Sequence, residues 1–413
     1  MKVTARTLSG GARLLTSRLA PPKSSKCISG KISVGIILVA ALVSPGPALY
    51  GAAHTDDSKK NTLAAPATLK PRIEVCFVLD TTGSMSGLID GAKQKIWSIA
   101  NELIGAKPAP DLRVGLVAYR DRGDEYVTRA FDLTNDIDTV YGHLQAFQAT
   151  GGGDTPESVN EALDQAVRNM SWSSDKRVLK IIFLVGDAPP HMDYAEGPKY
   201  PEICQEAMKR DLLINTVQCG NLPETTPVWK QIAQLSEGSY AAIAQSGDMA
   251  VIATPLDGEL ADLNRKLGAT LVAYGGAAAQ LSVAAKQHAS EVAPASVAAD
   301  RLAYNIRSGV AVQGEGELLD SLNNGSLKWE SLKKDQLPPE LQKLNEVQLR
   351  TEIDKKQKER AALQTRIQKL GQERETYLEN ERKHLAAQGK GDAFDATVAQ
   401  AIRAQAAGKG IHY

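Results

Sequence analysis

Apolar and polar positions along residues 73–244 form a pattern that predicts strands alternating with helices. Short runs rich in Val, Ile and Leu are typical of buried strands, whereas apolar residues three or four positions apart are typical of helices. The predicted strands are residues 73–80, 112–119, 128–133, 178–186, 212–217 and 239–244. The predicted helices are residues 88–103, 137–147, 156–170, 201–209 and 228–235. This alternation predicts an α/β fold with a doubly wound, mostly parallel, six-stranded sheet.

After residue 250 the pattern becomes helical. Residues 260–285 are rich in Ala and Leu, and we expect their opening turn to pack on the sheet as the last helix of the α/β domain. A charged helix is predicted over residues 341–387, with Leu363, Ile367 and Leu370 at a spacing that suits a partly coiled-coil region.

The charged helix nevertheless makes a poor long dimeric coiled coil. Arg360, Arg374 and Glu381 occupy positions at which the heptad pattern requires apolar residues, and Gly371 interrupts it. We therefore expect this helix to fold back or to pack on neighbouring helices. A final short helix has Phe394, Val398 and Ile402 on one face, which predicts that it packs against another element.

The N-terminal residues 1–53 are predicted to be a targeting segment. The apolar run Ile32–Val43 is shorter than the roughly 20 residues that span a bilayer, and its length suits the apolar part of a signal peptide. We expect this segment to be cleaved, which would give an exported protein that is periplasmic or secreted. Retention of the segment as a membrane anchor is the alternative, and a mitochondrial presequence is a weaker one.

The composition changes along the chain divide it into five predicted parts. These are a signal peptide or N-terminal anchor (1–53), a polar linker (54–71), an α/β domain (72–250), a helical connecting region (251–340) and a charged helical, partly coiled-coil region (341–413).

Charge and cysteine content exclude several functions. Seven of the 48 Lys and Arg residues lie in residues 1–53, which contain no Asp or Glu, so the rest of the chain has 41 basic and 48 acidic residues and a net charge of −7. This balance gives no electrostatic basis for binding nucleic acid. Beyond the N-terminal segment the cysteines are Cys76, Cys204 and Cys219, whose spacing suits neither a disulfide framework nor a zinc or redox site.

Oxygen-bearing side chains follow the first predicted strand at alternating positions. Asp80, Thr82 and Ser84 come directly after the apolar run that ends at Leu79, so a tight turn there brings three oxygens together. Oxygen ligands without nitrogen or sulfur suit a hard cation such as Mg²⁺. For any one of these residues, a helix N-cap or a turn is an equally good interpretation.

Two later segments strengthen the interpretation as a metal site. Thr155 follows three glycines at positions 151–153, and Pro156 suits the first turn of a helix that begins there. Asp187 ends another buried strand, and ligands of open parallel sheets bind beyond the carboxyl ends of the strands.

The neighbouring His191 is expected to be a supporting residue rather than a ligand. The charged loop 119–125 is expected to be solvated. The alternative is that it faces the metal site, where Asp121 or Asp124 would influence which ligand binds.

These segments resemble the von Willebrand factor A domain with its metal-ion-dependent adhesion site. The family motif Asp-x-Ser/Thr-x-Ser, a distant Thr and a distant Asp is matched by the following residues: Asp80, Thr82, Ser84, Thr155 and Asp187. The sequence motifs Asp-Thr-Thr-Gly-Ser-Met and Gly-Asp-Ala-Pro-Pro-His are similar to those of the hemicentin and alpha-kinase-associated branch of the family. The tail, with Leu-Pro-Pro-Glu-Leu before a charged helix, resembles exported bacterial proteins of this kind.

The resemblance implies a non-enzymatic, divalent-metal-dependent protein-binding module acting outside the cytoplasm. Asp80 and Asp187 would act largely through water, and Mg²⁺, or else Mn²⁺ or Ca²⁺, would take a carboxylate from a protein partner. The alternative is a structural envelope scaffold, in which the C-terminal helices self-associate and the metal only stabilises the domain. Contact with a membrane is expected only if the N-terminal segment is retained. An enzyme is disfavoured, since no nucleophile with a paired base and no phosphate-binding loop is present in the sequence.

Overall fold

The first predicted strand lies in the centre of a sheet in the computed structural model. The structure describes residues 70–413 except 154, 248–250 and 389–392, so the predictions for residues 1–53 and for most of the linker 54–71 lie outside the described residues. Within the described part, six strands lie in the order β3-β2-β1-β4-β5-β6. The strands are β1 (Arg72–Asp80), β2 (Asp111–Tyr119), β3 (Thr128–Thr134), β4 (Leu179–Gly186), β5 (Leu213–Cys219) and β6 (Tyr240–Ile243). All neighbouring pairs are parallel except β2 and β3, as the pattern predicts.

Strand β1 shows why the central strands read as continuous apolar runs. Successive side chains of a strand point to opposite faces of the sheet. Ile73, Val75 and Phe77 therefore join the apolar core on one face, while Cys76 and Val78 join the core on the other. Both faces are covered, so β1 is buried from Ile73 to Asp80, and the charged Glu74 within it is compensated by Arg113 at 3.0 Å and by the N–H of Ser173 at 2.8 Å.

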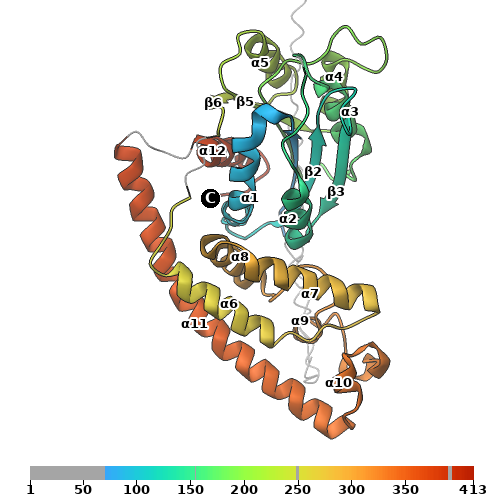
Figure 1. Cartoon of the computed structure of the whole chain (residues 1–413), viewed down its shortest axis with the longest axis vertical. Helices are drawn as coiled ribbons and strands as arrows, with labels where there is room; N and C mark the ends of the chain where they lie inside the picture. Colours follow the sequence, from blue (N-terminus) through green and yellow to red (C-terminus); the bar gives the residue numbers. More distant parts are fainter. Residues whose placement is uncertain (1–69, 154, 248–250, 389–392) are drawn as a thin grey trace, which may run out of the picture. The chain divides into compact units, whose positions relative to one another are not determined.

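Helices cover each face of the sheet (Figure 1). One face is covered by α1 (Ser86–Leu103), α2 (Ile137–Ala146) and α12 (Ala393–Ala407). The other is covered by α3 (Val159–Asn169), α4 (Tyr200–Lys209) and α5 (Thr225–Leu235). This is the doubly wound arrangement that the alternation of strands and helices predicts.

The start of α3 differs from the prediction. The helix begins at Val159 rather than at Pro156. Glu157 forms a parallel β-bridge with Pro190, and its N–H donates to the carbonyl oxygen of Pro189 at 2.9 Å. Residues 155–158 are therefore held against the segment that follows β4. That contact is between residues far apart in the sequence, which local helix signals do not reveal.

The last helix that packs on the sheet is also not the predicted one. We expected the opening turn of residues 260–285 to pack on the sheet, but α6 (Asp257–Ala269) contacts α7 (Ala277–Val292), α8 (Ala295–Ser308) and α11 (Glu346–Ala387) instead. The C-terminal α12 lies beside α1 and β6 in its place. Its apolar face, which includes Phe394, Val398 and Ile402, enters the core of the sheet.

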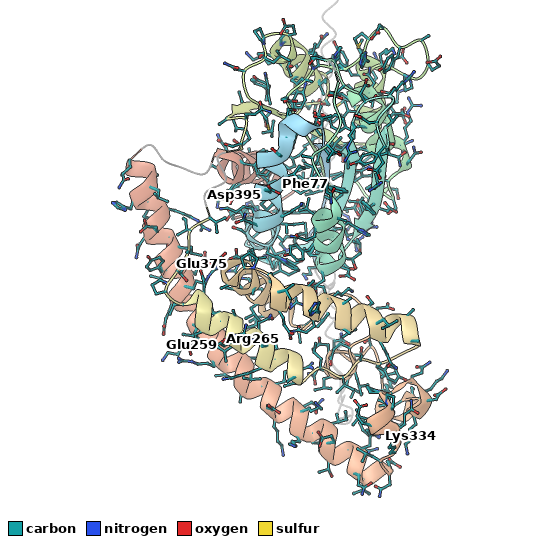
Figure 2. The ribbon with its side chains drawn as sticks, in the orientation of Figure 1. Phe77, Glu259, Arg265, Lys334, Glu375 and Asp395 are labelled. Atoms are coloured by element: carbon teal, nitrogen blue, oxygen red, sulfur yellow. The ribbon has the colours of Figure 1, made fainter. Side chains whose placement is uncertain are left out.

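Polar contacts fix α12 on the domain as well. Lys95 of α1 pairs with Asp395 at 3.1 Å, and Figure 2 shows Asp395 on α12 next to α1. The side-chain amides of Asn215 and Gln405 hydrogen-bond to each other at 2.8 and 3.0 Å. The last residues of the chain are thus an integral part of the α/β core.

The helical region between β6 and α12 is held by buried arginines. Arg360 of α11 is 1% exposed and donates to Glu317 and Asp320 at 2.8–2.9 Å, where Glu317 is the N-cap of α9 (Leu318–Asn323). Arg374 of α11 pairs with Asp257 and Asp300 at 2.6 Å. Two of the three charged residues that break the heptad pattern, Arg360 and Arg374, are therefore the ones that dock α11 on its own chain.

The helical region is packed on the α/β domain through α8. Arg301 of α8 makes a two-bond ion pair with Asp138 of α2 at 2.6 and 2.8 Å. Tyr304 of α8 contacts Trp97 of α1, with ring centroids 5.5 Å apart. The remaining helices are short: α10 (Pro339–Gln342) and the 3₁₀ turns η1 (Gly83–Met85), η2 (Trp329–Ser331) and η3 (Lys334–Gln336). Among the described residues, no helix combines the length and the apolar character needed to cross a membrane.

We predict that Arg360→Met lowers the free energy of unfolding by about 3–5 kcal/mol, because it leaves Glu317 and Asp320 buried without a cation. Urea unfolding followed by circular dichroism measures the change. The matched control is Arg366→Met on the same helix. Arg366 pairs with Glu259, which is about half exposed, so this substitution should lower the free energy of unfolding by about 1 kcal/mol or less. Equal effects of the two substitutions would contradict the role given to Arg360.

Candidate metal site

Three connections meet at the carboxyl ends of β1 and β4. The turn after β1 is joined to the glycine-rich connection by the N–H of Gly83, which donates to the carbonyl oxygen of Gly151 at 3.1 Å. The same connection is joined to the segment after β4 by the bridge between Glu157 and Pro190. The three sequence segments proposed to form a metal site are therefore hydrogen-bonded to one another.

Asp80 lies at the bottom of this site and is completely buried. Its Oδ1 accepts hydrogen bonds from the Thr82 N–H at 2.8 Å and from the Thr82 hydroxyl at 2.7 Å. The Thr82 and Ser84 hydroxyls are 3.2 Å apart. Asp80 Oδ2 has no hydrogen-bond partner among the described residues, which is costly for a buried carboxylate oxygen. The first motif therefore converges as the alternation of its residues predicts.

Asp187 lies beside these groups, directly after β4. Its Oδ2 accepts a hydrogen bond from the Gln245 side-chain amide at 2.7 Å, and its charge raises the pKa of Asp80. The two aspartates thus interact electrostatically although they are more than a hundred positions apart in the sequence.

An open cavity of about 420 Å³ is lined by residues that directly follow β1 and β4. Its walls include Thr82, Ser84, Thr155 and Asp187, and Gln245 lies at its edge. Thr155 reaches the cavity from an exposed part of the connection, whereas Thr82 is buried. Four of the five predicted ligands therefore line one cavity, and the fifth, Asp80, is buried and hydrogen-bonded to one of them, Thr82.

Glu157 is a candidate that the sequence analysis did not single out. It also lines the cavity and is only 3% exposed. Its Oε2 has no hydrogen-bond partner among the residues that the structure describes. In the sequence, an acidic residue two positions after Thr155 reads as part of a helix start, so its burial toward the site was not evident.

The site carries more negative than positive charge. Burial, and then the charge of Asp187, raise the pKa of Asp80 to about 7. Burial, and then the charges of Asp80 and other nearby carboxylates, raise the pKa of Glu157 to about 9. Arg120 is a nearby cation, but its guanidinium donates to the carbonyl oxygens of Thr81 and Gln148 rather than to a carboxylate of the cavity. These carboxylates repel one another, and a bound cation would relieve the repulsion.

The charged loop after β2 is partly buried, contrary to the expectation of a solvated loop. Asp121 is 6% exposed and accepts hydrogen bonds from the hydroxyls of Ser158 at 2.9 Å and Tyr194 at 2.9–3.0 Å. His191 stacks on Tyr194, and its Nε2 lies 3.4 Å from Asp121. These contacts come from segments far along the chain, which the local charge pattern does not reveal. Asp121 and His191 therefore connect the loop after β2 to the segment before α3 and to the segment after β4.

The residues present are chemically suited to a hard divalent cation. The cavity combines carboxylates with hydroxyls and contains an unpaired buried carboxylate oxygen, which is the donor set that Mg²⁺ prefers. Among the described residues, no group of three or more His, Cys, Asp or Glu side chains is arranged to hold a metal ion by itself. An ion here would therefore depend on the hydroxyls of Thr82 and Ser84 and on water, as well as on the carboxylates.

Comparison with known families finds similarity to the von Willebrand factor A domain. Residues 74–255 match the family model of the von Willebrand factor A domain. The mouse von Willebrand factor A domain-containing protein 7 is 34% identical over 122 residues, which are 30% of this chain and 12% of that protein. An ariadne-like RING finger protein of Acanthamoeba polyphaga mimivirus is 26% identical over 123 residues, which are 29% of this chain and 11% of that protein. The chain thus spans about an eighth of the length of the relatives it matches.

Two solved structures are similar to part of the chain. One is proximal thread matrix protein 1 from the mussel byssus with a zinc-occupied adhesion-site motif, at 15% identity and a TM-score of 0.34, covering 43% of this chain and 42% of that one. The other is the von Willebrand factor A domain of SpRpn10, at 13% identity and a TM-score of 0.33, covering 44% of this chain and 100% of that one.

We predict that Gly152→Ala lowers the free energy of unfolding by about 1–3 kcal/mol and weakens cation binding. Gly152 has a φ of +74°, and a Cβ there would lie 3.0 Å from the Thr82 Cβ and 3.3 Å from Glu157 Oε1. Thermal unfolding with and without 5–10 equivalents of Mn²⁺, roughly a saturating excess, measures both effects. Gly153→Ala is the control, since a Cβ there meets nothing within 4 Å. A harmful Gly153→Ala with a neutral Gly152→Ala would contradict the close approach.

Proposed function

We propose that the von Willebrand factor A domain of this chain is a divalent-metal-dependent protein-binding module. The candidate ligands are the five motif residues Asp80, Thr82, Ser84, Thr155 and Asp187, with Mg²⁺ as the expected metal and Mn²⁺ or Ca²⁺ as alternatives. The single observation that carries the proposal is the buried Asp80, whose Oδ2 has no partner among the described residues and whose Oδ1 accepts from Thr82, a residue that lines the cavity together with Ser84 and Asp187.

Each residue has a separate part in this proposal. Asp80 fixes the Thr82 hydroxyl through a 2.7 Å hydrogen bond, so the hydroxyl oxygen lone pairs remain available toward the cavity. Ser84 presents a second hydroxyl from the exposed side of the turn. Asp187 would balance the charge of the ion, and the Gln245 side-chain amide fixes its orientation by donating a hydrogen bond to Asp187 Oδ2. A bound Mg²⁺ supplies an electrophilic centre that accepts an oxygen ligand from outside the chain.

The proposed partner is a protein that offers a carboxylate to the ion. The cavity is open to solvent on the side of Thr155 and Ser84, both of which are exposed, so a side chain of another protein can reach it. The charge balance of −7 beyond the N-terminal segment gives no support for a nucleic-acid partner. The apolar run at residues 32–43 supports a location outside the cytoplasm, in the periplasm or in the medium, and it lies outside the described residues.

A non-enzymatic role is part of the proposal. Burial raises the pKa of Cys204 to about 12 and raises the pKa of Cys76 and Cys219 even further, so these thiols are not nucleophiles at neutral pH. The hydroxyl of Ser158 donates to Asp121 and is buried, which leaves it inaccessible to a substrate.

We predict that Asp80→Ala and Asp187→Ala abolish saturable Mg²⁺ binding while the domain stays folded, because each removes a carboxylate that repels the other in the metal-free protein. Calorimetric titration of Mg²⁺, Mn²⁺ and Ca²⁺ into the full chain measures binding, and circular dichroism checks the fold. Asp90→Ala is the control, since Asp90 is an exposed acid on α1. Cation binding that survives both cavity substitutions would refute the proposal.

A structural envelope scaffold is the second candidate, and the surface of α7 favours it. Leu281 and Val292 of this helix are 70% and 68% exposed, which suits contact with another copy of the chain. On this alternative the metal only stabilises the domain, and the C-terminal helices carry assembly.

The scaffold alternative predicts that the full chain self-associates equally in EDTA and in Mg²⁺, and that the double substitution Leu281→Ser, Val292→Ser weakens self-association on the order of tenfold. Sedimentation velocity measures the oligomer. A chain that stays monomeric in both buffers would exclude the scaffold and leave the metal-dependent module.

A further inference from the structure

We propose that Glu157, rather than Thr155, is the side chain through which the glycine-rich connection binds the metal ion, and that this third carboxylate lets the ion bind before any partner does. The inference rests on the proposed metal site, but it concerns a residue that the five-residue motif does not include.

The backbone of Glu157 is fixed on both sides. Its N–H donates to the Pro189 carbonyl oxygen at 2.9 Å, and its own carbonyl oxygen accepts from the N–H of His191 at 3.1 Å. Both partners belong to the segment that directly follows Asp187. Glu157 is therefore paired with Pro190, three residues after Asp187, as a neighbouring strand residue would be.

The side chain of Glu157 lies against the predicted ligands. A Cβ on Gly152 would be 3.0 Å from the Thr82 Cβ and 3.3 Å from Glu157 Oε1, so the side chains of Thr82 and Glu157 both lie next to the position that a side chain at Gly152 would take. The carboxylate is buried among protein atoms, and Oε2 has no hydrogen-bond partner within the described part of the chain. A buried carboxylate oxygen that borders the cavity without a partner is suited to a cation.

Thr155 lacks these features. It is exposed, and the structure gives its hydroxyl no hydrogen bond to another described residue. Positioning a ligand in a solvated segment costs conformational entropy when the ion binds, whereas Glu157 is already fixed. The connection thus reaches the cavity with one unrestrained hydroxyl and one pre-positioned carboxylate, of which the carboxylate is the stronger ligand for a hard cation.

Glu157 changes the charge available to the ion. Asp80 and Asp187 provide two negative charges, and Glu157 provides a third once its carboxyl proton is released to solvent as the cation binds, so a divalent ion is retained without a carboxylate from outside. The three carboxylates do not form a direct three-ligand cluster in the described residues. A direct bond to Glu157, with Asp80 and Asp187 acting through water, does not need one.

The test compares Glu157→Gln, Thr155→Ala and Asp80→Ala with the unmutated full chain, by calorimetric titration of Mn²⁺ in the absence of any partner. We expect Glu157→Gln to weaken Mn²⁺ binding on the order of tenfold or more and Thr155→Ala to change it by about twofold or less. Asp80→Ala is the reference for loss of the site. The melting temperature of each metal-free variant is measured in parallel.

The melting temperatures separate a metal ligand from a structural residue. Glutamine keeps the shape of Glu157, Oε2 has no partner to lose, and any repulsion from neighbouring carboxylates is removed, so metal-free Glu157→Gln should melt at the temperature of the unmutated chain or above it, while its Mn²⁺-induced increase is reduced. A drop in the metal-free melting temperature with unchanged Mn²⁺ affinity would overturn the inference. So would full affinity in Glu157→Gln with loss in Thr155→Ala, an outcome that leaves the proposed function intact. Absence of Mn²⁺ binding in the unmutated chain would overturn both.

Discussion

The burial of Asp80 at the end of the central strand is the constraint on which the rest of the site depends. A carboxylate completely removed from water is unfavourable unless hydrogen bonds or an opposite charge compensate for it. Thr82 satisfies one oxygen twice, and the other has no partner among the described residues. Asp187 and Glu157 are further acidic groups nearby, and burial, followed by the charges of neighbouring carboxylates, raises the pKa of both Asp80 and Glu157. A site assembled in this way is poorly compensated on its own, and a hard cation is the simplest compensation.

Close backbone approach makes this crowding possible. Gly152 allows the glycine-rich connection to pass directly over Thr82, and Gly186 leaves room for the Tyr119 hydroxyl beside Asp80. The connection is then fixed by the bridge from Glu157 to Pro190 and by the hydrogen bond from Ser158 to Asp121. The loops that form the cavity are consequently held by contacts outside it. This arrangement satisfies the requirement that binding residues be positioned by a rigid surrounding structure.

The helical region is not an appendage of the sheet. The chain leaves the α/β domain after β6, forms the helices α6 to α11 and returns so that α12 covers the sheet beside α1. Buried arginines set this path: Arg374 joins α11 to α6 and α8, and Arg301 joins α8 to α2. Because removing one partner of a buried ion pair leaves an uncompensated charge, such pairs favour one packing over its alternatives. The helices and the α/β domain therefore share one continuous set of contacts along the described chain.

The sequence by itself determined the sheet, the order of its strands and helices, and the convergence of Asp80, Thr82 and Ser84. These features follow from local periodicity, because alternation of side chains along one strand and through one turn needs no distant partner. Only the tertiary structure decided that Glu157 is buried beside the cavity, that α3 starts at Val159, and that α12 rather than residues 260–285 completes the sheet. It also decided that Arg360 and Arg374, which read as interruptions of a heptad, are buried ion-pair partners. Each of these depends on contacts between residues far apart in the chain, whose energies exceed the local preferences that a single sequence displays.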